Sequence, residues 1–464
     1  MSFDSLSYLL FLPVTALVHW LCPGRWRWIV LLAASLFFYA SWNAPLTLLL
    51  LSVIAVTYLA GRALARTERP GRRRLILALA MAVCIGLMLY FKYFRFLAES
   101  LQALLRLAGH DPAWRLWDVI LPVGLSFYAF QAMSYVIDVY RDPAQAETHP
   151  GYYALYISFF PQLVAGPIER AERLLPQLRA ERIWERSDLT MGLRLLCSGY
   201  FRKLVIADLC GRLVTQVYAA ARPDGSAVAL ATVLFGIQIY CDFAGYSEIA
   251  QGSARLLGVR LMRNFDRPYL SRSVREFWRR WHISLSRWFS DYLYIPLGGS
   301  RKGLLRQLAA AVTVFAVSGL WHGANWTFLA WGSLHGVYML TDILWRRKGK
   351  PLPKTLGLML TYAAVTFAWI FFRADSLSHA WFLLGRLFSV WDLRAGLSLF
   401  SSGLPELLWL LLALAQSPML HRLTREDLPA PTGMAFVYLT SAAALAFLIR
   451  AEQSAPSAFI YFQF

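Results

Sequence analysis

Long apolar stretches recur along the whole chain, and they constrain its fold more than any other feature. A bilayer core is about 30 Å thick, so a helix needs roughly 20 apolar residues to cross it. We expect roughly nine to thirteen helices that cross or enter a membrane, some of them re-entrant. The stretches lie near residues 7–21, 28–41, 44–60, 75–97, 119–140, 152–165, 190–220, 228–258, 308–345, 356–372, 380–393, 404–420 and 434–450. The sequence therefore predicts a multi-pass, all-α integral membrane protein that forms a single domain over residues 1–464.

The composition supports a membrane environment. Hydrophobic residues make up 58% of the chain and charged residues 16%, whereas a soluble domain carries about a quarter charged residues. The 46 Lys and Arg against 27 Asp and Glu give a net charge of +19. In a membrane protein such an excess is expected from basic cytoplasmic loops and from contact with anionic headgroups. We therefore expect membrane lipids as partners and no nucleic acid.

Basic loops orient the chain in the membrane. The loop at 61–74 carries six arginines, so the positive-inside rule places it in the cytoplasm. The loops at 301–306 and 346–354 are also basic and should lie on the same side. The stretch 308–345 must then enter the membrane and return. A simple hairpin would place its residue His322 near the far face, and a re-entrant pair nearer the middle; both arrangements stay open.

His322 is the leading candidate for chemistry. It lies between Trp321 and Gly323, with Asn325 and Trp326 close by. Ionisable groups at membrane depth are costly and usually line a functional cavity. Apolar surroundings favour a neutral imidazole, which can accept a proton as a general base. The alternative is a core histidine that bonds a backbone carbonyl.

Glycines interrupt the stretch that contains His322, and they predict a close approach of two helices or a broken helix. They are Gly319, Gly323, Gly332 and Gly336. A third histidine, His335, also lies in this apolar and aromatic stretch.

The segment 264–303 differs from the rest because it mixes arginines with aromatic residues. Three arginines fall at helical spacing, and so does a set of one tryptophan, one histidine and one serine. The first set is Arg272, Arg275 and Arg279, and the second is Trp278, His282 and Ser286. This pattern predicts a helix over 272–287 that lies at the headgroup level, with one basic face and one aromatic face, and does not span.

His282 has several possible roles. It could orient a substrate, polarise a carbonyl group or end the aromatic helix. A zinc site is the alternative for His282 and His322, but there is no H-E-x-x-H motif, and no cysteine or carboxylate flanks His322 at ligand spacing. We therefore expect no metal.

Asp242 belongs to a polar cluster in an apolar stretch, next to Tyr240. It could line a tunnel or pair with an arginine of the 272–287 helix, and pairing is favoured. Asp138 lies beside Arg141 near a helix end and is interpreted as structural. The chain has no G-x-S-x-G motif and no phosphate-binding P-loop, which argues against serine hydrolases and ATP-driven transport.

Long ordered blocks of sequence resemble one family. They are LPVGLSFYAFQAMSYVIDVYR at 121–141, FFPQLVAGPIER at 159–170, QIYCDFAGYSEIA at 238–250, the segment 264–303, GLWHGANWTFLAWGSLHG at 319–336 and FIYFQF at 459–464. With these blocks the chain resembles the membrane-bound O-acyltransferase superfamily, and within it the membrane subunits of bacterial alginate O-acetyltransferases. The resemblance implies a ring of helices around a transmembrane tunnel, with re-entrant cytoplasmic helices.

The resemblance also implies roles for the two histidines. The histidine of the family's W-H-G block is catalytic, which corresponds to His322, and that of the R-R-W-H block is the second important position, which corresponds to His282. We expect the residues around them to bind substrate. These are Trp278, Trp281, Ser286, Trp321, Asn325, Asp242, Tyr240 and Arg279.

The activity implied is an O-acetyltransferase of the bacterial inner membrane. Acetyl-CoA or another acetyl thioester would be the donor, no cofactor would be bound, and the acceptor would be an exported polysaccharide such as alginate. A periplasmic partner resembling SGNH hydrolases would complete the transfer. The alternatives are acetylation of bacterial cellulose or another exopolysaccharide, D-alanyl transfer to a cell-wall polymer, a lipid or protein acyltransferase, and a transporter or structural subunit of an export complex.

Overall fold

A computed structural model describes residues 1–110, 114, 117, 119–164, 166–349, 352–389, 391, 392, 394 and 424. Every regular element in these residues is a helix, which confirms the all-α fold. The expected stretches at 404–420 and 434–450 and the closing block at 459–464 lie outside them. The chain groups into two compact units, one of residues 1–188 with 253–261 and one of residues 189–252 with 262 onward. Whether these act as a single domain stays a prediction.

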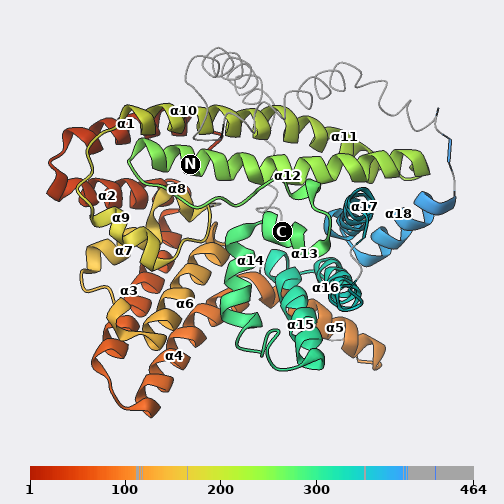
Figure 1. Ribbon diagram of the computed structural model, residues 1–464, viewed down its shortest axis with the longest axis horizontal. Helices are drawn as coiled ribbons and strands as arrows, with labels where there is room; N and C mark the ends of the chain where they lie inside the picture. Colours follow the sequence, from red (N-terminus) through yellow and green to blue (C-terminus); the bar gives the residue numbers. More distant parts are fainter. Residues whose placement is uncertain are drawn as a thin grey trace. The chain divides into compact units, whose positions relative to one another are not determined.

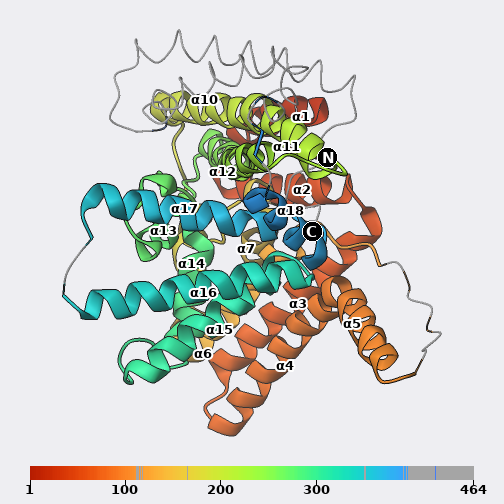
Figure 2. The same ribbon diagram turned by 90° about the vertical axis from the view of Figure 1, so that its right-hand side faces the viewer.

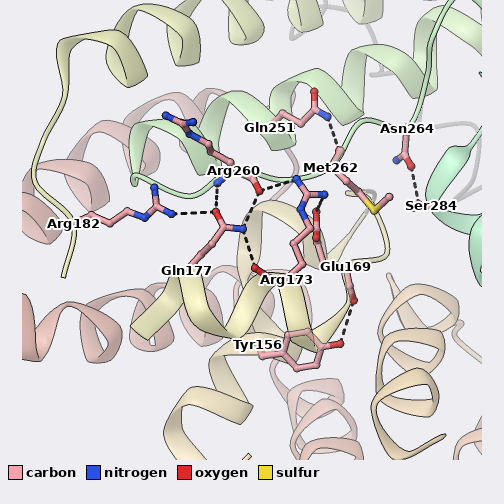
Figure 3. A network of polar contacts seen from close by, with 10 residues as sticks. All are labelled: Tyr156, Glu169, Arg173, Gln177, Arg182, Gln251, Arg260, Met262, Asn264 and Ser284. Atoms are coloured by element: carbon pink, nitrogen blue, oxygen red, sulfur yellow. Dashed lines mark hydrogen bonds and ion pairs between the residues drawn. The ribbon is translucent and has the colours of Figure 1, made fainter. Parts of the chain in front are cut away.

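The first unit contains the N-terminal helices. They are α1 (Leu6–Leu21), α2 (Arg27–Ala40), α3 (Ala44–Arg66), α4 (Pro70–Met88), α5 (Phe94–Leu107), α6 (Leu125–Arg141), α7 (Pro150–Ser158), α8 (Phe160–Leu163) and α9 (Ala171–Arg179). Helices α3, α4 and α6 pack against one another. Within this unit, residues 253–261 attach through Ser253, whose Oγ lies 2.7 Å from the Tyr8 hydroxyl, and through Arg260, whose backbone N–H donates to Gln177 of α9 (2.9 Å; Figure 3).

The remaining helices lie wholly or mainly in the second unit. They are α10 (Arg186–Tyr200), α11 (Asp208–Tyr218), α12 (Gly225–Leu256), α13 (Val274–Arg280), α14 (Ile283–Phe289), α15 (Leu304–His322), α16 (Trp326–Arg347), α17 (Lys354–Arg373) and α18 (Leu377–Ser389). Helices α10 and α11 form one long rod that runs alongside α12 (Figure 1). Helices α15 and α16 lie side by side, and α17 packs on α16 (Figure 2).

Five helices among the described residues are long and apolar enough to cross a membrane. They are Ala44–Arg66, Pro70–Leu107, Gly225–Leu256, Leu304–His322 and Lys354–Arg373. The protein is therefore a multi-pass membrane protein. Each begins or continues within one of the apolar stretches expected from the sequence, because helix length is dictated by the apolar run.

A π-helical turn joins α10 to α11 at residues 201–207 and brings two consecutive cations to α12. Arg202 Nε lies 3.2 Å from Glu248, and Lys203 Nζ lies 2.8 Å from Asp242. Side chains of adjacent residues diverge by about 100° on a regular α-helix. The wider turn allows both cations to face the same neighbouring helix, and such turns occur frequently at functional sites.

Helices α15 and α16 form a hairpin with His322 at its turn. Whether this hairpin crosses the membrane or is re-entrant stays a prediction. Asn325 begins α16 and accepts a hydrogen bond from the backbone N–H of Thr327 (3.0 Å). The helices approach closely at Gly319, where an added Cβ would lie 2.3 Å from the carbonyl oxygen of Phe328. The expectation that glycines permit close helix approach is confirmed here.

The substitution Gly319→Val should separate α15 from α16. Overpacking a closely packed contact costs about 1–3 kcal/mol, so we expect a lower melting temperature in detergent and a loss of activity. Gly86→Val is the matched control, because Gly86 is also inside a helix and an added Cβ there meets nothing within 4 Å. Equal melting temperatures for the two variants would contradict the close contact.

Candidate active site

His282 and His322 lie 40 residues apart in the sequence but next to each other in the second unit. Their ring centres are 6.4 Å apart. The two residues are buried, with 0% and 2% of their surface exposed. The structure therefore brings together the two histidines that the sequence singled out.

The prediction of a single helix over 272–287 is wrong. The segment forms two short helices, α13 and α14, and the chain breaks between them at His282, whose φ is 41°. A left-handed conformation costs a non-glycine residue roughly 1–3 kcal/mol and is found where the surrounding structure enforces it. The aromatic face predicted from Trp278, His282 and Ser286 is therefore interrupted at its middle member.

Asn264 holds the break in place. Its backbone oxygen accepts from the N–H of Ile283 (2.9 Å), and its side-chain oxygen accepts from the Ser284 hydroxyl (2.7 Å; Figure 3). Its amide nitrogen donates to the Ser247 hydroxyl on α12 (3.0 Å). Asn264 is itself buried. These bonds fix the chain directly after the strained residue to α12 and so position the imidazole of His282.

Aromatic rings enclose the two imidazoles. The Phe243 ring lies 4.6 Å from that of His282 and nearly perpendicular to it. The Trp321 ring lies 5.8 Å from His282 and 5.1 Å from His322. Trp331 and Phe372 contact His322 at 5.1 and 5.5 Å. The histidines are thus separated from bulk water by apolar rings.

Sequence reasoning missed three of these neighbours, Phe243, Trp331 and Phe372. Phe243 directly follows Asp242, and Trp331 lies within the block that contains His322, so both could have been found. Phe372 is one apolar residue among many in α17, and nothing in its local sequence distinguishes it.

Burial lowers the pKa of His282 to about 3. The charged form is disfavoured because the ring loses its hydration, and burial is the cause of the shift. His282 therefore stays neutral at physiological pH and can offer one N–H donor and one acceptor nitrogen.

Three of the residues expected to bind substrate lie in the aromatic cluster around the histidines. Trp321 contacts both imidazoles. Trp281 precedes His282 and lies 6.2 Å from the Tyr240 ring on α12. Trp278 packs one step further out, against Trp331.

Three other expected residues make structural contacts or lie at the surface. Ser286 donates to the backbone oxygen of Trp281 (3.2 Å). Asn325 caps α16 and donates to the backbone oxygen of Asp375 (3.2 Å). Arg279 is exposed on α13. Contact of any of these residues with substrate stays a prediction.

Asp242 pairs with a cation. Its carboxylate lies 2.8 Å from Lys203 Nζ. The structure thus shows the favoured interpretation, pairing, with a lysine of the π-helical turn, which has no clear sequence signal; pairing with an arginine of 272–287 stays a prediction. Asp138 lies 3.8 Å from Arg141, in agreement with its structural interpretation.

No group of three or more His, Cys, Asp or Glu side chains is arranged to hold a metal ion in the part of the chain that the structure describes. Two neighbouring imidazoles can accept or donate a proton or carry a group.

Residues 35–374 match the sequence model of the MBOAT, membrane-bound O-acyltransferase family. The chain belongs to this family. Both histidines and all of their ring contacts fall within the matched residues, so the protein is an acyltransferase of the membrane-bound O-acyltransferase family with this cluster as its candidate active site.

Relatives share most of the chain. It is 36% identical to the probable alginate O-acetylase AlgI of Azotobacter vinelandii over 398 residues, 84% of this chain and 79% of that protein. It is 36% identical to the probable alginate O-acetylase AlgI of Pseudomonas aeruginosa over 424 residues, 89% and 81% of the two chains. It is also 34% identical to a peptidoglycan O-acetyltransferase of Helicobacter pylori over 384 residues, 76% and 72% of the two chains.

The backbone strain at His282 can be tested with two substitutions. Asparagine tolerates the left-handed region, whereas valine does not. We expect His282→Asn to fold as well as the wild type and to lose acyl transfer, and His282→Val to lose melting temperature as well. Thermal unfolding in detergent and a transfer assay measure the two effects. A valine variant as stable as the asparagine variant would contradict the strained geometry.

Proposed function

We propose that this acyltransferase moves acetyl groups from a cytoplasmic thioester across the bacterial inner membrane, for O-acetylation of an exported polysaccharide such as alginate. One observation carries the proposal: two buried imidazoles with ring centres 6.4 Å apart lie in a chain that relatives named as alginate O-acetylases match over 84% and 89% of its length. The separation suits a small acyl group that contacts both rings.

The chemistry follows from the roles open to two neighbouring imidazoles. His322 takes the proton of the acceptor hydroxyl, whose oxygen attacks the thioester carbon; the C–S bond breaks, and the sulfur leaves as a thiol with that proton. His282 donates a hydrogen bond to the carbonyl oxygen as negative charge develops there. The enclosing aromatic rings exclude water, which would otherwise hydrolyse the thioester.

A two-step transfer, in which His322 carries the acyl group, uses the same residues. The imidazole nitrogen would then attack the thioester carbon; the C–S bond breaks, and the sulfur leaves as a thiol with the proton that the ring loses. In a second step the acceptor oxygen attacks the acetyl-imidazole, the C–N bond breaks, and the ring takes the hydroxyl proton. Both routes require His322, and both leave the bulk of the donor outside the aromatic cluster.

The donor is proposed to be acetyl-CoA, acting as a substrate and not as a bound cofactor. Its phosphates need cations, and Arg279 and Arg287 are exposed on α13 and α14, next to His282 in the sequence. The neighbouring Arg275 lies 3.5 Å from Asp342, and Arg280 lies 2.7 Å from Glu276. Arg279 and Arg287 are therefore better placed to bind phosphate through the planar guanidinium group.

A second protein is proposed to receive the acetyl group on the periplasmic side. His282 and His322 are almost fully buried, so a long polysaccharide cannot reach them. A partner that resembles SGNH hydrolases would present its own hydroxyl to the membrane site and then acetylate the polymer.

Peptidoglycan is a second candidate acceptor. The observation in its favour is the 34% identity to a relative named as a peptidoglycan O-acetyltransferase. The membrane step would be the same for either polymer, since only the hydroxyl received by the partner changes.

The substitution His322→Ala should abolish acetylation of the exported polymer, because the base or carrier is lost. A loss of at least 100-fold is expected for a general base. The measurement is the acetyl content of secreted polysaccharide from cells that carry the variant, with membrane levels of the protein matched. His379→Ala is the control, since His379 lies on α18 beside Asp375. Normal acetylation with His322→Ala would show a transporter or structural role instead.

Arg279→Gln should weaken donor binding. Loss of one charge-assisted contact to phosphate is expected to raise the KM for acetyl-CoA about threefold to tenfold with little change in kcat. The effect should shrink at high salt, because exposed charges are screened. Arg72→Gln, which removes an exposed arginine near the start of α4, is the control. Equal KM values for the two variants would place the phosphates elsewhere.

A further inference from the structure

Three rings next to the candidate active site pack against one another. They belong to Trp278 on α13 and to Trp331 and His335 on α16. The ring centres are 5.8 Å apart for Trp278 and Trp331, 5.1 Å for Trp278 and His335, and 4.9 Å for Trp331 and His335. Their exposed fractions are 8%, 0% and 0%. The three rings form one buried triangle, here called the Trp-Trp-His cluster.

The polar atoms of this cluster have no protein partner. Both indole N–H groups and both ring nitrogens of His335 are buried without a hydrogen bond to any residue that the structure describes. Buried polar groups in proteins nearly always have a partner, and each one left unsatisfied costs about 1–3 kcal/mol. Four such atoms in one cluster indicate a ligand that the protein side chains leave room to bond.

The chemistry of the rings defines that ligand. An indole only donates, and a neutral imidazole donates through one nitrogen and accepts through the other. A hydroxyl or water oxygen can accept from both indoles and donate its own hydrogen to the imidazole, which gives the three hydrogen bonds typical of a buried water. This oxygen satisfies three of the four polar atoms and leaves the N–H of His335, whereas a carbonyl oxygen, which cannot donate, would satisfy two at most.

We propose that the Trp-Trp-His cluster binds one hydroxyl oxygen, that of a water molecule or of an alcohol. Packing fixes the plane of the His335 ring, because Phe277 and Phe315 lie nearly parallel to it at 6.4 and 6.2 Å. The same cluster reaches the active site, since the Trp331 ring also lies perpendicular to that of His322 at 5.1 Å. A hydroxyl held here is therefore one ring away from the proposed base.

A histidine that only fills space at position 335 would tolerate different substitutions from one that binds a ligand. A core histidine that only fills space could be replaced by phenylalanine, which matches the flat ring and removes two buried unsatisfied atoms. A binding role needs the nitrogen atoms and tolerates a change of shape. The two roles therefore predict opposite results for His335→Phe and His335→Gln: packing favours phenylalanine, and binding favours glutamine.

The test compares His335→Phe with His335→Gln in the full-length protein in detergent. Glutamine keeps a donor and an acceptor, so we expect its activity to stay within about threefold of the wild type, whereas phenylalanine should lose about tenfold, the equivalent of one hydrogen bond of about 1.4 kcal/mol. Phenylalanine equal to the wild type in melting temperature and activity would overturn the proposal. So would equal damage from both substitutions, because only shape would then matter.

The source of the hydroxyl is read from two measurements. If the ligand is a structural water, His335→Phe lowers the melting temperature of the resting protein and leaves the KM of an acceptor unchanged. If it is an alcohol, the resting protein keeps its melting temperature, and the KM for ethanol rises when ethanol is the probe acceptor and CoA thiol release from acetyl-CoA is followed. The alcohol case rests on the proposed function, since the acceptor of that reaction is an alcohol.

The stability measurement keeps the two proposals separate. A wild-type protein that releases no CoA from acetyl-CoA would defeat the proposed function and, with it, the alcohol case. A lower melting temperature of His335→Phe than of His335→Gln would then still support a bound water, and equal melting temperatures would overturn the cluster. If both the melting temperature and the KM stay unchanged, the proposal for the Trp-Trp-His cluster is overturned and the proposed function is not.

A second pair of substitutions covers the case in which His335→Phe does not fold. Trp278→Phe removes one of the two indole donors, and Trp288→Phe is its matched control, since Trp288 lies on α14, outside the cluster, and is also 8% exposed. We expect Trp278→Phe to lose several times more activity than Trp288→Phe. Equal losses would overturn the proposal.

Discussion

The candidate active site depends on burying two imidazoles among apolar side chains while keeping each ring in a fixed orientation. A buried polar ring is costly unless its environment orients it and supplies partners. Aromatic side chains meet this demand, because edge-to-face contacts fix a ring in angle as well as position. Phe243 and Trp331 meet the imidazoles of His282 and His322 at 85° and 89°. Aromatic packing therefore sets the angles of the two imidazoles, in addition to the hydrogen bonds of Asn264 that hold the chain at His282.

Strain at His282 is the second consequence of that demand. A helix running unbroken from 274 to 289 would carry the residues after Arg280 around the helix axis at 100° each. The left-handed residue instead turns the chain at the point where the imidazole must face His322. The cost is offset by Asn264, whose buried side-chain amide bonds to Ser284 on α14 and to Ser247 on α12. Local strain and its compensation are therefore found a few ångströms apart, as is common where chemistry needs an awkward geometry.

The sequence predicted what depends on composition and spacing, and missed what depends on tertiary contacts. The apolar runs identified the helices at 44–66, 225–256 and 354–373, because a bilayer imposes length and polarity on each helix separately. The W-H-G block identified His322 through its apolar surroundings. The break at His282 was missed because the spacing of Arg272, Arg275 and Arg279 fits a continuous helix as well as an interrupted one. Lys203 was missed as the partner of Asp242, since a π-helical turn depends on the helix it packs against.

The π-helical turn at residues 201–207 also affects the active site. Arg202 and Lys203 are almost fully buried, and each faces a carboxylate on α12. A buried ion pair is weak evidence for stability, because desolvation consumes most of the attraction between its charges. These pairs contribute geometry instead, because two fixed ion pairs hold α12 in one rotation against the π-helical turn. That rotation also directs Phe243 and Ser247, one and five residues after Asp242, toward His282 and Asn264. The charges on one face of α12 thus determine how the opposite side of the same helix meets the active site.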